Sequence, residues 1–236
     1  MGLLGEDLAF AHALTTQEAE SVMALGFPKR YPADAHLVSE GDRSHHVMVV
    51  SEGWVTVSVA TDRGATRLIV GLRGPGELLG EMSALDRHPR SATLRALGEV
   101  EAQVIDGDVF RRFLAVNPRV GGLVMRQLAV RLRSADRERS ALASLTVLQR
   151  LAGRLAELSR PGEAGPYLPE GAATEGPGVV IHLAQDELAA TVGATREAVA
   201  KALRLLREQG IVRTGNRVVE ILDPRLLSLL AEGHSD

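Results

Sequence analysis

The chain of 236 residues contains no cysteine. It therefore has no disulfide, no cysteine-ligated iron–sulfur cluster and no thiol redox switch, which fits a reducing cytosol. No apolar run approaches the roughly 20 residues of a membrane-spanning helix, and no positively charged segment precedes the first apolar residues. These absences exclude oxygen sensing through a cysteine-bound cluster and predict a cytoplasmic protein that does not enter a membrane.

The sequence also lacks the GxSxG, HExxH and GxxxxGKS or GxxxxGKT motifs, so no enzyme class is indicated and we expect no enzyme. His45 and His46 are neighbours, and adjacent strand residues point to opposite faces, so they would chelate poorly. We expect no metal site. With 27 basic and 30 acidic residues, the net charge of -3 argues against a protein that coats nucleic acid through bulk charge.

The length predicts two domains, and 45% hydrophobic residues suffice for a core in each. From Pro28 to about Asp106, alternating β-forming runs such as WVTVSVA at 54–60 are separated by glycines, which predicts an antiparallel roll. Two capping boxes, Thr15 with Glu18 and Thr146 with Gln149, predict helix starts before and after this region. The Pro- and Gly-rich segment 161–178 is predicted to be a loop without an assigned function.

A long helix is predicted after Pro118. One series of residues repeats every seven positions: Gly121, Leu128, Ala135 and Leu142. Two apolar residues between them, Met125 and Leu132, are also seven positions apart. This heptad pattern indicates a seam with a second helix. The alternative is a helix packed on its own β-domain, but Val124 and Val130 lie off the seam and could make that contact. We therefore expect a parallel homodimer, with a hinge at 143–145.

The segment from Gln185 to Val212 indicates two short helices joined by a turn. Gly193 can adopt a positive φ at the end of the first helix, and the Thr195 hydroxyl can cap the second. An apolar stripe follows at helical spacing: Ala198, Val199, Ala202, Leu203 and Leu206. Strand candidates at 179–183 and 218–222 flank the pair, and the second is expected to pair with residues 211–213 across the turn at 214–216. The segment is therefore predicted to be a winged helix-turn-helix.

The opposite face of the second helix is polar, with long donors near its N-terminus. Between Thr195 and Arg217 the chain has six basic and two acidic residues, a local charge of +4. Such a cluster can neutralise a phosphate backbone. A solvated amphipathic hairpin would give the same pattern in isolation, so the surrounding order of segments decides the interpretation.

That order of segments resembles the Crp/Fnr family of bacterial transcription regulators over nearly the whole chain. The motifs that carry the resemblance are EGD at 40–42, EG at 52–53, GPGE at 74–77, GE at 80–81, RSAT at 90–93 and GATREAVAKAL at 193–203. The resemblance implies an α+β fold with three parts: a cyclic-nucleotide-binding β-roll over 1–117, a dimerisation helix over 118–143 and a winged helix-turn-helix domain over 144–236.

The resemblance also implies a ligand site. A buried cyclic phosphate needs charge-assisted donors, which Arg90 and the Ser91 hydroxyl can supply, while Gly80 allows close approach of the backbone. Glu81 is implied to accept from a ribose 2′-hydroxyl. The alternative is that Glu81 and Arg90 simply pair with each other across a loop.

Base recognition departs from the pattern of the cyclic AMP receptor, which offers a Thr-Ser pair from its long helix. The aligned residues here are Ala135 and Asp136. An ionised Asp136 only accepts hydrogen bonds and suits a guanine N1–H and N2–H₂ edge, or an adenine amino group reached differently. Arg133 and Asp136 form an RxxD pattern seen in binders of cyclic di-GMP, with Arg139 close by. The alternative is a solvated helix face with i,i+4 pairs.

At the DNA end, the resemblance implies that Arg196 and Glu197 contact base edges, Arg196 on a guanine and Glu197 on a cytosine amine. Lys201 replaces an arginine of the cyclic AMP receptor and lacks its bidentate fork. Thr195, Arg204, Arg213 and Arg217 are candidate phosphate contacts. Ala184 stands where a threonine usually caps the first helix, a loss of ~1 kcal/mol unless Gln185 or Asp186 compensates.

These observations predict a homodimeric, cytoplasmic transcription regulator whose affinity for double-stranded DNA is controlled by a cyclic nucleotide, cyclic AMP or a related one. It needs no other cofactor, and RNA polymerase is a further candidate partner. Two alternatives stay open: a cyclic di-GMP-responsive regulator of the same fold, and a ligand-independent DNA binder with a degenerate pocket.

Overall fold

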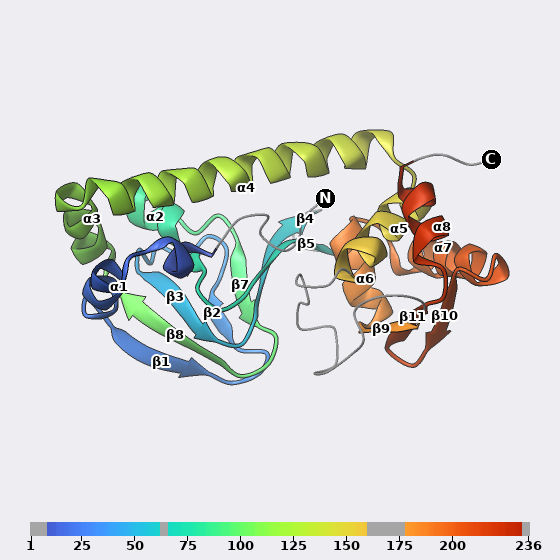
Figure 1. Cartoon of the computed structure of the whole chain (residues 1–236), viewed down its shortest axis with the longest axis horizontal. Helices are drawn as coiled ribbons and strands as arrows, with labels where there is room; N and C mark the ends of the chain where they lie inside the picture. The colour runs from blue at the N-terminus through green and yellow to red at the C-terminus, as the bar shows by residue number, and fades with distance from the viewer. Residues whose placement is uncertain (1–8, 62–65, 160–177, 233–236) are drawn as a thin grey trace. The chain divides into compact units, whose positions relative to one another are not determined.

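The computed structural model describes residues 9–61, 66–159 and 178–232 (Figure 1). The contacts within the chain divide it into two compact units. The chain passes from one unit to the other inside the long helix, between Arg133 and Ser134, and Thr66–Ile69 also belongs to the C-terminal unit. The three-part division with cuts after residues 117 and 143 stays a prediction. Most of the loop expected at 161–178 lies outside the described residues, which resume at Gly178.

The N-terminal unit begins with two short helices, η1 (Phe10–Ala13) and α1 (Thr16–Met23). The expected capping box is present. The Glu18 backbone N–H donates to the Thr15 hydroxyl oxygen at 3.3 Å, and the Thr15 backbone N–H donates to the Glu18 carboxylate at 2.8 Å. The start of α1 is thereby fixed by its own sequence.

Two four-stranded sheets form the predicted roll. One has the order β1 (Phe27–Tyr31), β8 (Val100–Ile105), β3 (Val47–Glu52) and β6 (Leu78–Leu79). The other has the order β2 (His36–Val38), β7 (Thr93–Ala96), β4 (Val55–Thr61) and β5 (Thr66–Arg73). Neighbours pair in antiparallel register, for example Val49 with Gln103 and Val57 with Leu94.

The alternation of side chains along β3 builds two separate cores. Met48 and Val50 belong to the core inside the roll, whereas Val47 and Val49 belong to a second core shared with helices. The second core contains Phe110 of α3 (Gly107–Val116). A short helix, α2 (Glu81–Asp86), interrupts the chain between β6 and β7. Its six residues carry no long periodic pattern, and the sequence analysis did not predict it.

The long helix α4 (Pro118–Ser144) uses one face to pack on the N-terminal unit. Val124 is buried there, as expected, but Leu128 also packs against this core although it lies on the heptad seam. Met125 and Leu132 of the seam remain 67% and 64% exposed. Two large apolar side chains of the seam therefore face outward in the single chain.

The C-terminal unit is the predicted winged helix-turn-helix. Helix α5 (Val147–Leu158) starts at the expected capping box of Thr146 and Gln149. The helix pair is α6 (Gln185–Val192) and α7 (Arg196–Glu208), and the wing is the antiparallel sheet β10 (Val212–Gly215), β11 (Val218–Ile221), β9 (Val179–His182). A last helix, α8 (Pro224–Ala231), packs against α5 and was not predicted. Asp223 caps it by accepting from the Leu226 N–H at 2.9 Å.

Buried Arg150 of α5 holds the turn of the helix pair. Its Nε donates to the Val192 carbonyl at 2.8 Å, and its Nη2 donates to the Gly193 carbonyl at 3.3 Å. These carbonyls end α6, where intrahelical partners are lacking, so the arginine satisfies them and fixes the turn. Among the described residues, no helix combines the length and apolar character needed to cross a membrane.

Candidate functional site

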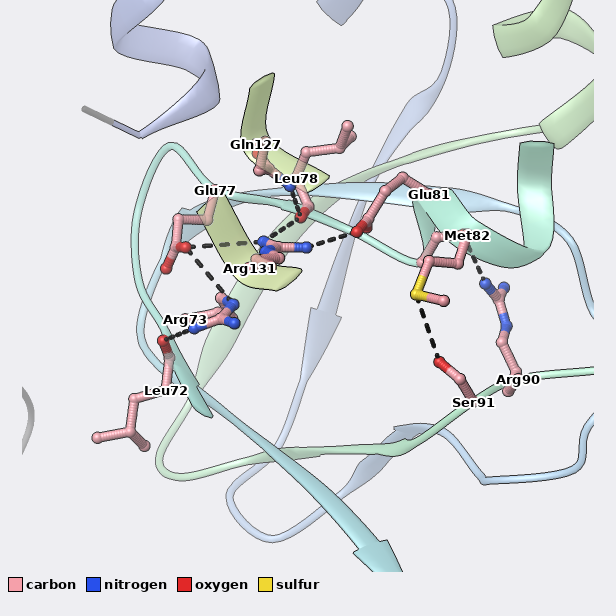
Figure 2. A network of polar contacts seen from close by, with 11 residues as sticks. Leu72, Arg73, Glu77, Leu78, Glu81, Met82, Arg90, Ser91, Gln127 and Arg131 are labelled. Carbon is pink, nitrogen blue, oxygen red and sulfur yellow. Dashed lines mark hydrogen bonds and ion pairs between the residues drawn. The ribbon is translucent and has the colours of Figure 1, made fainter. Parts of the chain in front are cut away.

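Arg90 lies at one end of a network of polar contacts in the roll (Figure 2). The residue is only 4% exposed. Its Nε donates to the Ser44 hydroxyl at 3.0 Å. Nη1 donates to the Gly80 carbonyl at 3.0 Å, and Nη2 donates to the His46 carbonyl at 2.7 Å. The protein therefore fixes the guanidinium in place with acceptors that carry no charge.

No ion pair between described residues includes Arg90. Burial lowers the pKa of its guanidinium, and the more distant carboxylates of Asp42 and Glu81 oppose this shift. Burial also lowers the pKa of the neighbouring His46 to about 4, with further lowering by Arg90 and Lys29, so this imidazole is neutral at pH 7. A buried cation beside neutral groups attracts an anion, because its burial is otherwise costly.

Glu81 pairs with Arg131 of α4 and not with Arg90. Its Oε1 lies 2.6 Å from Arg131 Nη1, and the side chains are 4% and 22% exposed. Arg131 Nη2 also donates to the Leu78 carbonyl at 2.9 Å, which Gln127 shares from one turn earlier at 3.1 Å. The alternative of a Glu81–Arg90 pair is thus wrong, because Glu81 pairs with Arg131.

Gly80 and Ser91 lie beside Arg90. Gly80 has a φ of +76°, and a Cβ there would come within 2.6 Å of Arg90 Nη1 and 3.0 Å of the His46 carbonyl oxygen. Only glycine therefore lets the strand end, the arginine and the loop meet so closely. The exposed Ser91 hydroxyl has a weak contact of 3.8 Å with Met82 Sδ.

Asp136 and Arg139 pair with each other. Asp136 Oδ1 lies 3.2 Å from Arg139 Nη2, and the two side chains are 56% and 82% exposed. The pair lies on a solvated helix face, as in the alternative interpretation, but its spacing is i,i+3 and not i,i+4. A contact of either residue with a ligand stays a prediction.

Three residues that make these contacts were not predicted from the sequence: Ser44, Gln127 and Arg131. A signal for the two helix residues existed: Val120 and Val124 are buried on α4, and Gln127 and Arg131 continue the same stripe at helical spacing. Polar residues that continue a buried stripe indicate a polar site beneath the helix. No local pattern identifies Ser44, because its partner Arg90 lies 46 residues away.

The second site is the exposed face of α7. Thr195 caps this helix by accepting from the Ala198 N–H at 3.2 Å, and Gly193 has a φ of +59° at the end of α6. The apolar stripe is inside, with Val199, Ala202, Leu203 and Leu206 buried. The side chains expected to face outward are exposed: Arg196, Glu197, Ala200, Lys201 and Arg204. The N-terminal half of the helix therefore presents long donors and the Glu197 carboxylate to solvent, at the end where a recognition helix contacts base edges.

Four exposed arginines of the helix pair and the wing have acidic neighbours. The pairs are Arg196 with Asp186 at 3.5 Å, Arg204 with Glu208 at 3.3 Å, Arg213 with Glu220 at 2.8 Å and Arg217 with Glu187 at 3.8 Å. The arginine side chains are 64–72% exposed. Exposed pairs of this kind contribute about 0–1 kcal/mol, so phosphates can replace the carboxylates at little cost.

The weak cap of α6 is compensated by a residue other than those expected. Ala184 has no capping oxygen, but the Glu187 carboxylate accepts from the Ala184 N–H at 3.1 Å. Gln185 and Asp186 were the two residues considered from the sequence, and neither makes this contact. The third helical residue reaches back to the N-cap, whereas side chains in the first two positions do not.

Comparisons with known proteins match both parts of the chain. Two family models match, a cyclic nucleotide-binding domain over residues 28–117 and a Crp-like helix-turn-helix domain over residues 149–230. The cyclic AMP receptor protein of Thermus thermophilus is 31% identical over 222 residues, which cover 94% of this chain and 96% of that protein. A CRP-like cAMP-activated global transcriptional regulator of Mycobacterium tuberculosis is 29% identical over 228 residues, covering 95% and 98%.

A solved structure extends the comparison to another ligand. The c-di-GMP responsive global regulator CLP of Xanthomonas campestris has a TM-score of 0.78 at 25% identity, covering 88% of this chain and 99% of that one. Proteins whose names specify two different nucleotides thus share the arrangement of parts seen in this chain.

Proposed function

The chain belongs to the Crp/Fnr family of transcription regulators, and from this premise we propose that it is a homodimer whose affinity for DNA is set by a cyclic nucleotide bound in the roll. At the coarser level the chain is a cyclic-nucleotide-binding transcription regulator, and this family consists of regulators and not of enzymes. The proposal concerns the ligand contacts, the dimer and the DNA contacts.

The observation that carries the proposal is the buried Arg90, fixed by three neutral acceptors. A cyclic phosphate would supply the anion that this guanidinium lacks, through charge-assisted hydrogen bonds. Ser91 would add its hydroxyl. Glu81, oriented by Arg131, would accept from the ribose 2′-hydroxyl, as the family resemblance implies.

The relatives support two classes of ligand. The names of the Thermus and Mycobacterium proteins specify cyclic AMP, whereas that of the Xanthomonas regulator specifies cyclic di-GMP. Cyclic di-GMP is therefore kept as a second candidate. Ligand-independent DNA binding loses its support, since it was expected to follow from a pair between Arg90 and Glu81, and Glu81 pairs with Arg131.

The exposed seam of α4 supports the dimer. Met125 and Leu132 are seven residues apart and largely exposed, which is unfavourable for large apolar side chains unless a partner covers them. A second copy would supply the same seam. It would also supply the second recognition helix needed to contact two half-sites about 34 Å apart.

In the complex with DNA, Arg196 and Glu197 would contact base edges, and Lys201 would supply a single donor. Thr195, Arg204, Arg213 and Arg217 would contact phosphates. The ligand can act only through a difference in its affinity for the DNA-binding and non-binding arrangements. RNA polymerase is a candidate partner, and we propose a cytoplasmic location.

Calorimetric titration with cyclic AMP, cyclic GMP and cyclic di-GMP tests the proposal. Binding of at least one, abolished by Arg90→Ala, is the expected result. A folded wild-type chain that binds none of the three would contradict it.

A further inference from the structure

We propose that Arg73 contacts the base of the bound nucleotide and selects guanine over adenine. This inference rests on the proposed function, because it requires a cyclic nucleotide with its phosphate at Arg90 and its ribose at Glu81. It adds a residue outside the motifs that the sequence analysis singled out, and it commits to one class of base.

The direction of the nucleotide in the pocket follows from its chemistry. The cyclic phosphate closes on the 3′ and 5′ oxygens of the ribose, and the base leaves from C1′ on the other side of the sugar. Figure 2 shows Arg90 and Ser91 on one side of Glu81, and Arg131, Glu77 and Arg73 on the other. A nucleotide held by Arg90 and Glu81 would therefore place its base toward Arg73.

A chain of ion pairs connects Glu81 with Arg73. Arg131 binds Glu81 at 2.6 Å and lies 3.7 Å from Glu77 Oε1. Arg73 Nε lies 3.6 Å from the same Glu77 oxygen. The other oxygen of Glu77 accepts from the Gly74 N–H at 2.9 Å, so the carboxylate itself is held. Two guanidinium groups thus share one fixed carboxylate at the far end of the site.

The guanidinium of Arg73 packs against the backbone of Gly71. The two residues are two positions apart on β5 and so lie on the same face of the strand. A Cβ on Gly71 would come within 2.8 Å of Arg73 Nη1 and 2.9 Å of Nη2. The guanidinium therefore lies directly over the glycine, and Nη1 also donates to the Leu72 carbonyl at 2.8 Å. With its side chain 11% exposed, Arg73 lies inside the roll unit and not on its surface.

The donor pattern of arginine decides which base fits. A guanidinium carries five N–H donors and no acceptor, and it can serve several acceptors at once. Guanine offers two neighbouring acceptors, O6 and N7, to such a fork, whereas adenine offers N7 beside an N6 amino donor. With adenine, the N6 amino donor would face the N–H donors of Arg73, and no hydrogen bond could form between them. Cyclic GMP and cyclic di-GMP both provide the guanine edge.

Calorimetric titration of four proteins with cyclic AMP, cyclic GMP and cyclic di-GMP tests the inference. The wild type is expected to bind a guanine nucleotide at least about tenfold more tightly than cyclic AMP. Arg73→Gln should move the ratio of dissociation constants toward cyclic AMP by about tenfold or more, because a glutamine amide matches adenine N6 and N7. Arg30→Gln, at an arginine that is 88% exposed on β1, is the control and should leave the ratio unchanged.

Gly71→Ala is a second variant that keeps the arginine. Its methyl group would displace the flexible guanidinium, so it should reduce the guanine preference in the same direction. A loss of stability alone would change the affinities for all nucleotides together and would not change their ratio.

The outcomes separate the inference from the proposed function. If the wild type prefers cyclic AMP, or if Arg73→Gln and Gly71→Ala leave the ratio unchanged, the guanine assignment is overturned while the proposed function stands. A wild type that binds none of the nucleotides overturns both. If only the affinity for cyclic di-GMP depends on Arg73, the guanine assignment is supported and cyclic di-GMP is identified as the nucleotide that carries the guanine.

Discussion

The Glu81 carboxylate lies 2.6 Å from the Arg131 guanidinium, across 50 residues of sequence. Glu81 is the first residue of α2, and Arg131 belongs to α4. The pair joins the start of α2 to the long helix, and no carboxylate in the described part of the chain forms an ion pair with Arg90. A ligand that contacts Glu81 would thus act on a residue that α4 already holds.

This pair predicts a large effect of Arg131→Met. The substitution leaves the Glu81 carboxylate buried without its cation, which should lower the free energy of unfolding by about 2–3 kcal/mol. Urea denaturation at pH 7 measures the change. Arg133→Met, at an exposed position two residues further along α4, is the matched control. Equal destabilisation by the two variants would show that the pair contributes nothing specific.

His46 predicts a pH dependence of stability. Burial holds its pKa at about 4 in the folded chain, below the ordinary value of 6.5. The unfolded chain therefore binds the extra proton first, so this contribution to stability is complete above pH 6.5 and is lost as the pH falls toward 4.

Between pH 7.5 and pH 5, His46→Gln should lose about 1–2 kcal/mol less unfolding free energy than the wild type. The variant retains the backbone carbonyl that accepts from Arg90. Urea denaturation at the two pH values measures the difference, with His36→Gln at an exposed position as the control. Identical pH dependence in wild type and His46→Gln would argue against a neutral, buried imidazole.

The seam of α4 predicts that Leu132→Glu produces a monomer. A carboxylate at a heptad position would be buried against its own copy in a parallel dimer, which is strongly unfavourable. Light scattering after size-exclusion chromatography measures the mass, and circular dichroism checks that the chain stays folded. Arg133→Glu adds the same acidic group one residue off the seam and should remain dimeric. A wild type that is already monomeric at micromolar concentration would refute the proposed seam.

For DNA recognition, Arg196→Ala should abolish sequence-selective binding while the dimer stays intact. Loss of a bidentate contact with guanine weakens binding to the preferred site by about 1–3 kcal/mol. Selection from random duplexes, followed by competition binding at fixed salt, measures the preference. Arg225→Ala on the exposed side of α8 serves as the control. If the Arg196→Ala protein still selected the wild-type DNA sequence, Arg196 would not be a base-contacting residue.

Features fixed by nearby residues could be predicted from the sequence. The cap of Thr195, the boxes at Thr15 and Thr146, and the wing hairpin depend on partners within a few positions, so their patterns are visible locally. The Glu187 cap was missed although it is also local. A glutamate three residues after the N-cap position was the available signal.

Features that depend on distant residues could not be predicted in this way. Arg131 contacts Glu81 only because α4 packs on the roll. The guanidinium of Arg73 lies over Gly71 only because the side chain folds back along its strand. Leu128 shows the same limit: its heptad position indicates the seam, but its side chain packs on the domain core. Periodicity identifies a face of a helix and does not identify which neighbour covers it.

We infer that a nucleotide held by Arg90 sets the affinity for DNA. Fluorescence anisotropy with a labelled duplex selected by the wild type measures this coupling. One of cyclic AMP, cyclic GMP and cyclic di-GMP should change the dissociation constant for this duplex by about 5- to 150-fold, the usual range of allosteric coupling. Arg90→Ala should bind the same duplex with an affinity that no nucleotide changes. A wild-type dissociation constant that stays the same with all three nucleotides at saturating concentration would contradict the claim.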